Sequence, residues 1–370
     1  MTAAKERHAS HAEPRALIVK LGSIGDVVMA IPAAYALHRK GYAIDWISGD
    51  VVAPVLRLYP WINVIEADEK ALLRGGSVAR LRAMLALSRR LAGRKYAVCA
   101  TLYYDRRYAL LTTGVRANRK VMLSRTDRRF ALLPGRHHID EYARILLGRE
   151  DSETPFQLPP VRASGLPEPP LARDRSRPRV VIAPAGAKNM MRDDALRRWP
   201  VANYVELTRQ LLAQGAEVVL AGGPDDAWAS PAFAGSDVVD LIAKLSLVQT
   251  LALMQSAEVT VTHDTGPLHM AGITSTAIVT IFGPTDPHGR LPQRENAVAL
   301  WGGEGFACRP CYDGRDFAPC TNNGCVQQIS PAMVVAEVER MLEAKRTGAS
   351  LLPRVIVPEH TPLVQVEGAR

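Results

Sequence analysis

The first residues that could do chemistry lie in a glycine-containing turn near the start of the chain. The turn runs from Lys20 to Asp26, follows a strand-like run and holds Gly22 and Gly25 before the aspartate. Glycines let a backbone approach a ligand closely, and the N–H groups at a helix start favour anions. Asp26 could act there as a general base toward a hydroxyl group. The same residue could instead simply cap the helix that follows.

Two turns in the second half of the chain combine glycine with charged side chains. One runs from Ala183 to Ala187, contains Gly186 and is followed by Arg197 and Arg198. Because a diphosphate leaving group gains negative charge as a sugar bond breaks, cations and backbone N–H groups here would stabilise its departure. A solvated basic turn would have the same composition. The other turn, from Leu220 to Asp226, holds Gly-Gly-Pro, which by itself predicts only a turn.

A further turn, from Thr262 to Gly272, has the most distinctive residues. Asp264 and Thr265 end a strand-like run and are expected to cap the next helix, and Gly266 would let a ligand approach its first turn. His269 lies on that same turn. A helix start beside a threonine hydroxyl and a histidine suits a pyrophosphate group, so the sequence predicts a phosphate-binding loop here.

Four of the five cysteines cluster near the end of the chain, at Cys308, Cys311, Cys320 and Cys325, and Cys99 lies apart in a strand-like run. One C-x-x-C pair followed by a more widely spaced pair is a weaker zinc signal than two C-x-x-C pairs. Stable disulfides are not expected in a cytoplasmic chain. The cluster is therefore a candidate structural zinc site, and a purely local structural role is the alternative.

Alternating strands and helices must position these turns, and the chain shows this alternation twice. In the first half we expect strands at residues 15–20, 43–47, 64–66 and 96–100 and helices at 25–39, 78–91 and 138–147. Residues 114–129 are basic and less periodic. In the second half we expect strands at 179–183, 217–221, 258–262 and 277–282 and helices at 201–214, 247–255, from 266 and at 331–345. This order predicts an α/β fold with two doubly wound parallel sheets, in which ligands bind beyond the carboxyl ends of the strands.

A proline-rich stretch without periodicity separates the two halves and predicts an interdomain linker. We expect a disordered tail at 1–14, a Rossmann-like domain at 15–157, the linker at 158–178, a second Rossmann-like domain at 179–346 and a poorly ordered tail at 347–370. The two domains are expected to face a central cleft.

The net charge of +9 suits an anionic partner. Nucleotide phosphates, a phosphorylated glycolipid, an anionic membrane surface and nucleic acid all fit, but no nucleic-acid-binding motif supports the last. No apolar stretch approaches the ~18 residues of a membrane helix. The first 14 residues lack the apolar core of a signal peptide, so we expect a cytoplasmic protein.

Four short segments occur in a specific order: Gly25-Asp26, Arg198-Trp-Pro, Asp264-Thr-Gly-x-x-His and Phe282-Gly-Pro-Thr-Asp-Pro. Through them nearly the whole chain resembles glycosyltransferase family 9, the ADP-heptose:lipopolysaccharide heptosyltransferases and their relatives. The resemblance implies the GT-B architecture, an inverting reaction that needs neither metal nor cofactor, and an ADP-sugar donor. It also implies a lipopolysaccharide core or lipid A precursor as acceptor, peripheral contact with the inner face of the inner membrane, and no nucleic-acid partner.

The resemblance also assigns roles to individual residues. Asp26 resembles the catalytic base that deprotonates the acceptor hydroxyl, and Lys20 resembles a lysine near the donor phosphates. Arg197 occupies a position where the family usually has lysine, an exchange that keeps the charge but is not neutral at a tight site. The predicted donor-binding residues are Lys20, Gly25, Gly186, Arg197, Asp264, Thr265, Gly266 and His269. The first domain would then hold the acceptor and the second the donor nucleotide.

The basic stretch in the first half is the candidate acceptor site. Arg116, Arg119 and Lys120, with Arg125 and Arg128 after them, could meet anionic groups of the acceptor, or could form only a solvated face. A non-catalytic nucleotide-sugar-binding module and a family 9 enzyme with a different sugar or acceptor are the alternative functions. A nicotinamide-dependent oxidoreductase is disfavoured because the chain lacks G-x-G-x-x-G.

Overall fold

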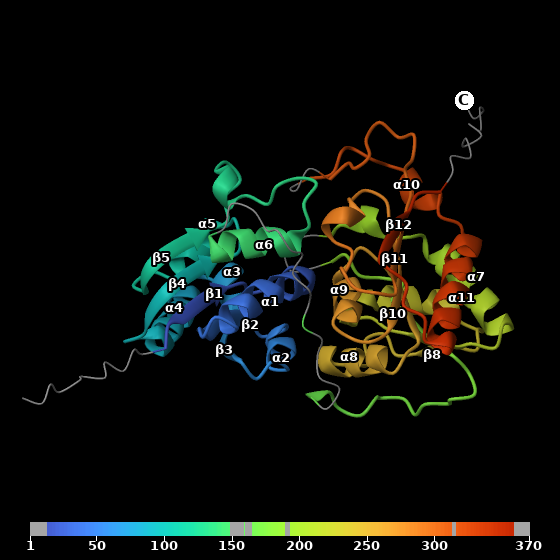
Figure 1. Cartoon of the computed structure of the whole chain (residues 1–370), viewed down its shortest axis with the longest axis horizontal. Coiled ribbons are helices and arrows are strands. Elements are labelled where there is room, and N and C mark those ends of the chain that lie inside the picture. Colours follow the sequence, from blue (N-terminus) through green and yellow to red (C-terminus); the bar gives the residue numbers. More distant parts are fainter. Residues whose placement is uncertain (1–12, 149–158, 160–164, 189–192, 313–315, 359–370) are drawn as a thin grey trace, which may run out of the picture. The chain divides into compact units, whose positions relative to one another are not determined.

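The chain divides into two compact units, which are described here one at a time. The structure, a computed structural model, describes residues 13–148, 159, 165–188, 193–312 and 316–358 (Figure 1). The first unit comprises Met1–Leu21, Ala33–Ala131 and Tyr142–Asp151. The second comprises Gly22–Pro32, Leu132–Glu141 and Ser152–Arg370. Two short segments from the first half of the chain therefore pack with the second unit.

The first unit contains a five-stranded parallel sheet with the order β3-β2-β1-β4-β5. Its strands are β1 Arg15–Val19, β2 Ala43–Gly49, β3 Ile62–Ala67, β4 Lys95–Thr101 and β5 Arg116–Met122. The inner strands β2, β1 and β4 are buried along most of their length. This burial is typical of parallel strands that are covered on both faces.

Short connecting helices link these strands. They are α1 Ile24–His38, α2 Ala53–Leu56, α3 Glu69–Leu73, α4 Ser77–Leu91, α5 Arg106–Leu110, the 3-10 turn η1 Arg128–Phe130 and α6 His138–Leu147. The first turns of α1 and α6 belong to the second unit.

The second unit contains a seven-stranded parallel sheet with the order β12-β11-β10-β9-β6-β7-β8. Its strands are β6 Arg179–Ile182, β7 Glu217–Leu220, β8 Val239–Asp240, β9 Val259–His263, β10 Ala277–Phe282, β11 Ala297–Trp301 and β12 Arg354–Ile356. The chain adds strands on one side of β6 and then on the other, beginning with β9. The neighbouring ends of β6 and β9 therefore form the topological switch point at which sheets of this kind bind ligands.

Helices accompany this sheet as well. They are η3 Ala195–Arg197, α7 Val201–Ala213, η4 Pro224–Phe233, α8 Leu247–Gln255, α9 Gly266–Gly272, η5 Pro287–Gly289, α10 Gly324–Gln327 and α11 Pro331–Thr347. Trp199 and Tyr204 lie in the apolar core, and the Trp199 indole donates a hydrogen bond to the carbonyl of Ile329 at 2.9 Å.

The predicted α/β class and parallel sheets are confirmed, but several elements were not predicted. The stretch 114–129 was described as basic and less periodic and no strand was predicted there, yet it contains β5, whose basic residues lie on an edge strand, where charged side chains are common. The strands β8, β11 and β12 and the helix α10 were also missed. The tail after Arg346 was expected to be poorly ordered, which is wrong for β12, because Arg354 pairs with Val298 of β11. The domain boundaries stay predictions, and residues 1–12 and 359–370 of the predicted tails lie outside the described residues.

Across the described ranges, no helix combines the length and apolar composition that crossing a bilayer would require.

Candidate functional site

The loops that follow β6 and β9 meet at the switch point of the second sheet. Gly186, in the loop after β6, has a φ of +111°, a conformation that favours glycine. A side chain there would begin 3.4 Å from the Cβ of Thr265, which follows β9. Two turns that the sequence assigned to donor binding are therefore in contact, although about 80 residues separate them in the chain.

Asp264 is the charged centre of this site and is almost fully buried. The Thr285 hydroxyl donates a hydrogen bond to its Oδ2 at 2.7 Å, and Nη1 of Arg197 and Nε of Arg290 lie 3.6 and 3.9 Å from the same oxygen. Burial by itself would raise the pKa of Asp264, but Arg197, Arg290 and the hydrogen bond from Thr285 lower it to about 2. The carboxylate is therefore charged at neutral pH.

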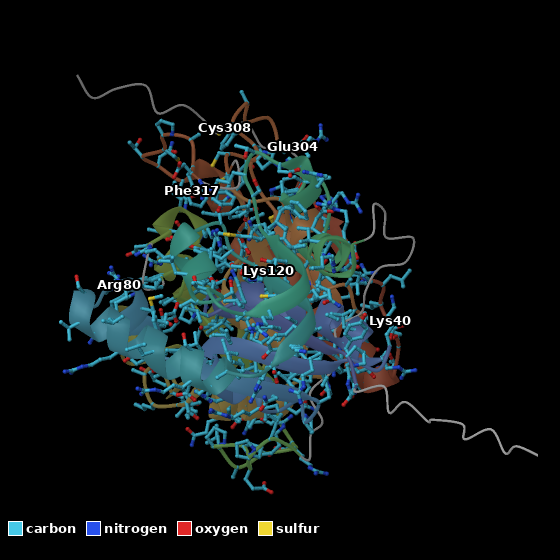
Figure 2. The ribbon with its side chains drawn as sticks, turned by 90° about the vertical axis from the view of Figure 1, so that its left-hand side faces the viewer. Lys40, Arg80, Lys120, Glu304, Cys308 and Phe317 are labelled. Atoms are coloured by element: carbon cyan, nitrogen blue, oxygen red, sulfur yellow. The ribbon has the colours of Figure 1, made fainter. Side chains whose placement is uncertain are left out.

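Two aromatic rings support the arginines around Asp264. Arg197 lies over the rings of Tyr312 and Phe317, at 5.4 and 5.7 Å, and Arg290 lies over Tyr312 at 5.5 Å. The two rings are 4.8 Å apart and come from the segment between β11 and α10, on which Figure 2 labels Phe317. Stacking on aromatic faces fixes a guanidinium group in place and leaves its N–H edge available for an anion.

Among the described residues, the ion pairs of Arg197 are long. Its separations from Asp264, 3.6 Å, and from Asp194, 3.5 Å, exceed the usual hydrogen-bond range. Its buried Nε has no hydrogen-bond partner among the described residues. The carboxylates therefore neutralise this cation without using all of its donors, which is an arrangement suited to an incoming phosphate.

The first turn of α1 packs against α9 within the second unit. A Cβ on Gly25 would lie 2.5 Å from Cδ2 of His269, and a Cβ on Gly266 would lie 3.5 Å from that of Ile24. Burial lowers the pKa of His269 to about 4, and the charges that act on it include Asp264, Arg290 and Asp26. The predicted base and the predicted donor loop therefore share one electrostatic environment.

Neither expected helix cap has the predicted form. Asp26 lies in the first turn of α1, two residues after its first residue Ile24, and not at the cap position. Thr265 is the N-cap residue of α9, but its side chain makes no cap hydrogen bond. Its hydroxyl instead donates to the carbonyl of His263 at 3.3 Å, because that oxygen lies within reach in the tight turn after β9.

His137, His138 and Arg290 were not predicted as site residues. Nε2 of His137 lies 2.9 Å from the carbonyl oxygen of Leu291, and its Nδ1 accepts a hydrogen bond from the Ile139 amide. These partners assign the proton to Nε2. Burial lowers the pKa of His138 to about 3, with Arg290 and Asp26 among the charges near it. Two sequence signals could have identified these residues. His137 and His138 are adjacent at the start of a predicted helix, and Arg290 follows Phe-Gly-Pro-Thr-Asp-Pro by three residues.

The other predicted donor- and acceptor-binding residues belong to the first unit. Lys20 is buried at the end of β1 in the first unit, with its Nζ 4.7 Å from the centre of the Tyr103 ring. On β5, Arg116 and Lys120 alternate with Arg119, so they point to the opposite face of the strand from it. Lys120 is labelled in Figure 2. The three predicted acceptor residues therefore do not form one surface.

Among the described residues the four late cysteines are not arranged as ligands of one metal ion, and a structural zinc stays a prediction. Cys308, labelled in Figure 2, and Cys320 are exposed, and Cys311 and Cys325 are partly buried. In the part of the chain that the structure describes, no three histidine, cysteine, aspartate or glutamate side chains are placed to hold a metal ion together. The other three thiols nevertheless lie close enough to act electrostatically on Cys325.

Comparisons with known proteins agree with this site and fold. A family model described as glycosyltransferase family 9 (heptosyltransferase) matches residues 84–320. Lipopolysaccharide heptosyltransferase 3 of Escherichia coli is 28% identical over 52% of this chain, and the match spans 58% of that protein, little more than half of its length. Lipopolysaccharide heptosyltransferase 1 of Pseudomonas aeruginosa is 25% identical over 90% of this chain and 99% of that protein.

Solved structures show the same fold at low sequence identity. A family 9 glycosyltransferase from Veillonella parvula has a TM-score of 0.68 at 18% identity, covering 89% of this chain and 97% of that one. An E. coli heptosyltransferase solved with ADP-2-deoxy-2-fluoro heptose has a TM-score of 0.63 at 20% identity, covering 88% of this chain and 99% of that one. The predicted GT-B type of fold, with two Rossmann-like α/β units, is confirmed.

Proposed function

Because the chain belongs to glycosyltransferase family 9, the heptosyltransferases, we propose that it transfers a heptose, or a similar sugar, from an ADP-sugar to a lipopolysaccharide core acceptor. The observation that carries the proposal is the pair of arginines held around buried Asp264 at the switch point of the second sheet. The ADP and ADP-sugar in the structures of similar proteins support the choice of donor.

The donor diphosphate would bind at the arginines Arg197 and Arg290. Their positive charge would stabilise the negative charge that develops on the leaving ADP, without a need for a divalent metal ion. Asp264 would hold both arginines in place, because it stays ionised at neutral pH. Gly186 and Gly266 would let the backbone approach the phosphates. Lys20 would add a further positive charge to the donor phosphates.

The transfer itself would be a single displacement with inversion. Asp26 would accept the proton of the acceptor hydroxyl as the general base. The hydroxyl oxygen would form a bond to the anomeric carbon from the face opposite the diphosphate. The bond between that carbon and the phosphate oxygen would break, and its electron pair would leave with ADP.

His269 fits a binding role better than a catalytic one. Its pKa of about 4 leaves the imidazole neutral at physiological pH, so it can donate one hydrogen bond but carries no charge. The acceptor would be an anionic glycolipid. Arg116, Arg119 and Lys120 stay the predicted contacts for it, and Arg116 and Lys120 are exposed on the same face of β5.

The decisive experiment replaces Asp26 by asparagine, which keeps the size of the side chain and removes the base. We expect Asp26→Asn to lower the rate of ADP release in the presence of acceptor by about 10²–10⁴-fold. Binding of the ADP-sugar, measured by calorimetry, should change little. Undiminished turnover in the variant would contradict the assignment of the base.

Donor and metal dependence are checked with the wild-type protein. Binding of ADP-, UDP- and GDP-sugars should favour ADP, and the rate should be the same with and without EDTA. Strong donor binding with no transfer to any lipopolysaccharide acceptor would instead indicate a non-catalytic module. A clear preference for UDP or GDP would contradict the proposed donor.

A further inference from the structure

The helix α4 has an apolar stripe on its exposed side. Val78, Leu81 and Leu85 are 64%, 58% and 48% exposed. They are three and four residues apart, so they follow one face of the helix. Leu87 and Leu91 are buried on the opposite side. Folding of the first unit therefore leaves a row of large apolar side chains in water.

Hydrogen bonds from the packed side fix the orientation of α4. Arg80 donates from Nε to the carbonyl of Leu72 at 3.2 Å and from Nη2 to that of Gly75 at 3.0 Å. Arg90 donates to the carbonyl of Glu66 at 2.6 Å. Figure 2 labels Arg80 near the first turn of the helix. Burying the stripe by rolling the helix would break these contacts, so the stripe stays exposed.

The exposed face also carries positive charge. Arg82 and Arg89 are exposed and follow Val78 and Leu85 by four residues each, so they form a row beside the apolar stripe. Residues 77–91 contain four arginines and no acidic residue. A partner for this face must therefore offer both negative charge and an apolar layer.

We propose that this face of α4 docks on an anionic phospholipid bilayer. The stripe would enter the boundary of the acyl chains, and Arg82 and Arg89 would meet the headgroup phosphates. At about 1.5 Å per residue the helix is too short to cross a bilayer and would lie in its surface. A second copy of the chain fits less well, because two α4 helices would bring Arg82 and Arg89 of one copy against the same two arginines of the other. The inference does not depend on the proposed function.

The test measures binding of the purified full chain to lipid vesicles by co-sedimentation. We expect binding to vesicles of equal parts phosphatidylglycerol and phosphatidylcholine and little binding to phosphatidylcholine alone. The double variant Leu81→Gln/Leu85→Gln removes the stripe but keeps good helix formers. It should lower the partition coefficient by about tenfold or more. The variant Arg82→Gln/Arg89→Gln should lower it by about tenfold and weaken its salt dependence.

Matched controls come from exposed residues of the second unit. Leu352→Gln removes a leucine that is even more exposed, at 77%, and Arg340→Gln an exposed arginine, and neither should change vesicle binding. Circular dichroism melts verify that every variant is folded. The proposal would be overturned if the α4 variants bound vesicles as well as the wild type does, or if the wild type did not bind them. So would a concentration-dependent dimer in sedimentation velocity that the Leu81→Gln/Leu85→Gln variant abolishes.

Discussion

At the scale of single residues, the site depends on charges that are held close together without being fully hydrogen-bonded. Arg197 and Arg290 both face Asp264 at distances of 3.6 and 3.9 Å. Such pairs are stable in a buried setting, because the carboxylate removes much of the cost of burying the cations. The buried Nε of Arg197, which has no hydrogen-bond partner among the described residues, can still bind an anion. An arginine at position 197 suits this role, because its planar group stacks on Tyr312 and Phe317.

Gly25 gives the sharpest prediction at this scale. In Gly25→Ala the new methyl group would begin 2.5 Å from the buried ring of His269, so the ring or the first turn of α1 must move. We expect a loss of about 1–3 kcal/mol in the free energy of unfolding. We also expect a large drop in the transfer rate, because Asp26 follows directly in the same turn. Denaturant unfolding and the ADP-release assay measure the two effects.

Gly165→Ala is the matched control for Gly25→Ala, since a Cβ at Gly165 would meet no atom within 4 Å. This control should leave the free energy of unfolding and the transfer rate unchanged. If Gly25→Ala behaved like this control, the close packing of α1 on His269 would be disproved.

At the scale of secondary-structure elements, β5 separates residues that are neighbours in the sequence. Arg119 donates hydrogen bonds to the carbonyls of Ile145 and Leu146 in the last turn of α6. Carbonyls at the end of a helix lack partners within the helix, so an arginine satisfies them. Arg116 and Lys120 point to the other face and are exposed. One face of β5 therefore stabilises the end of α6 through Arg119, and the other face presents Arg116 and Lys120 as candidate binding residues.

We predict that Arg119→Ala and Lys120→Ala will have different effects. Arg119→Ala should lower the free energy of unfolding by about 1–3 kcal/mol, because buried carbonyls lose a charged donor. Lys120→Ala should leave stability within about 0.5 kcal/mol, and under the proposed function it should raise the KM for the acceptor. Urea unfolding and acceptor titrations measure these effects. Equal stability of the two variants would contradict the role of Arg119 at the end of α6.

At the scale of the whole molecule, buried histidines are concentrated in the second unit. Burial lowers the pKa of His138 and His263 to about 3 and that of His269 to about 4. It also lowers the pKa of His137. Among the described residues the first unit has one histidine, His38. Lowering the pH should therefore destabilise the second unit more than the first.

The direction of this pH effect follows from proton binding. Histidine in an unfolded chain titrates near pH 6.5, so below that pH the unfolded state binds more protons than the folded one. The stability of the second unit is fully present above about pH 6.5 and falls as the pH drops toward 4, by up to about 1.4 kcal/mol per pH unit for each such histidine. We expect calorimetry to show a lower Tm for this unit at about pH 5 than at about pH 7.

Two controls identify the transitions. ADP should raise the Tm of the second unit if it binds there, and His269→Gln should reduce the pH dependence, whereas His38→Gln should not. A transition of the second unit with the same Tm at both pH values would contradict the prediction.

The sequence by itself determined the class of the fold and the positions of the chemical turns. Hydrophobic periodicity and glycine-containing turns are local signals, so they predicted most strands and helices and placed Gly186 and Asp264 at strand ends. The ordered segments Gly25-Asp26 and Asp264-Thr-Gly-x-x-His indicated the family, which the family model confirms.

Only the tertiary structure decided which residues meet. The sheet order makes β6 and β9 neighbours, so Gly186 contacts Thr265. Packing brings Arg290 to Asp264 and places His138 near Asp26. It also turned Arg119 toward the end of α6. These outcomes depend on contacts between distant segments and on the direction of each side chain, and a local pattern contains neither.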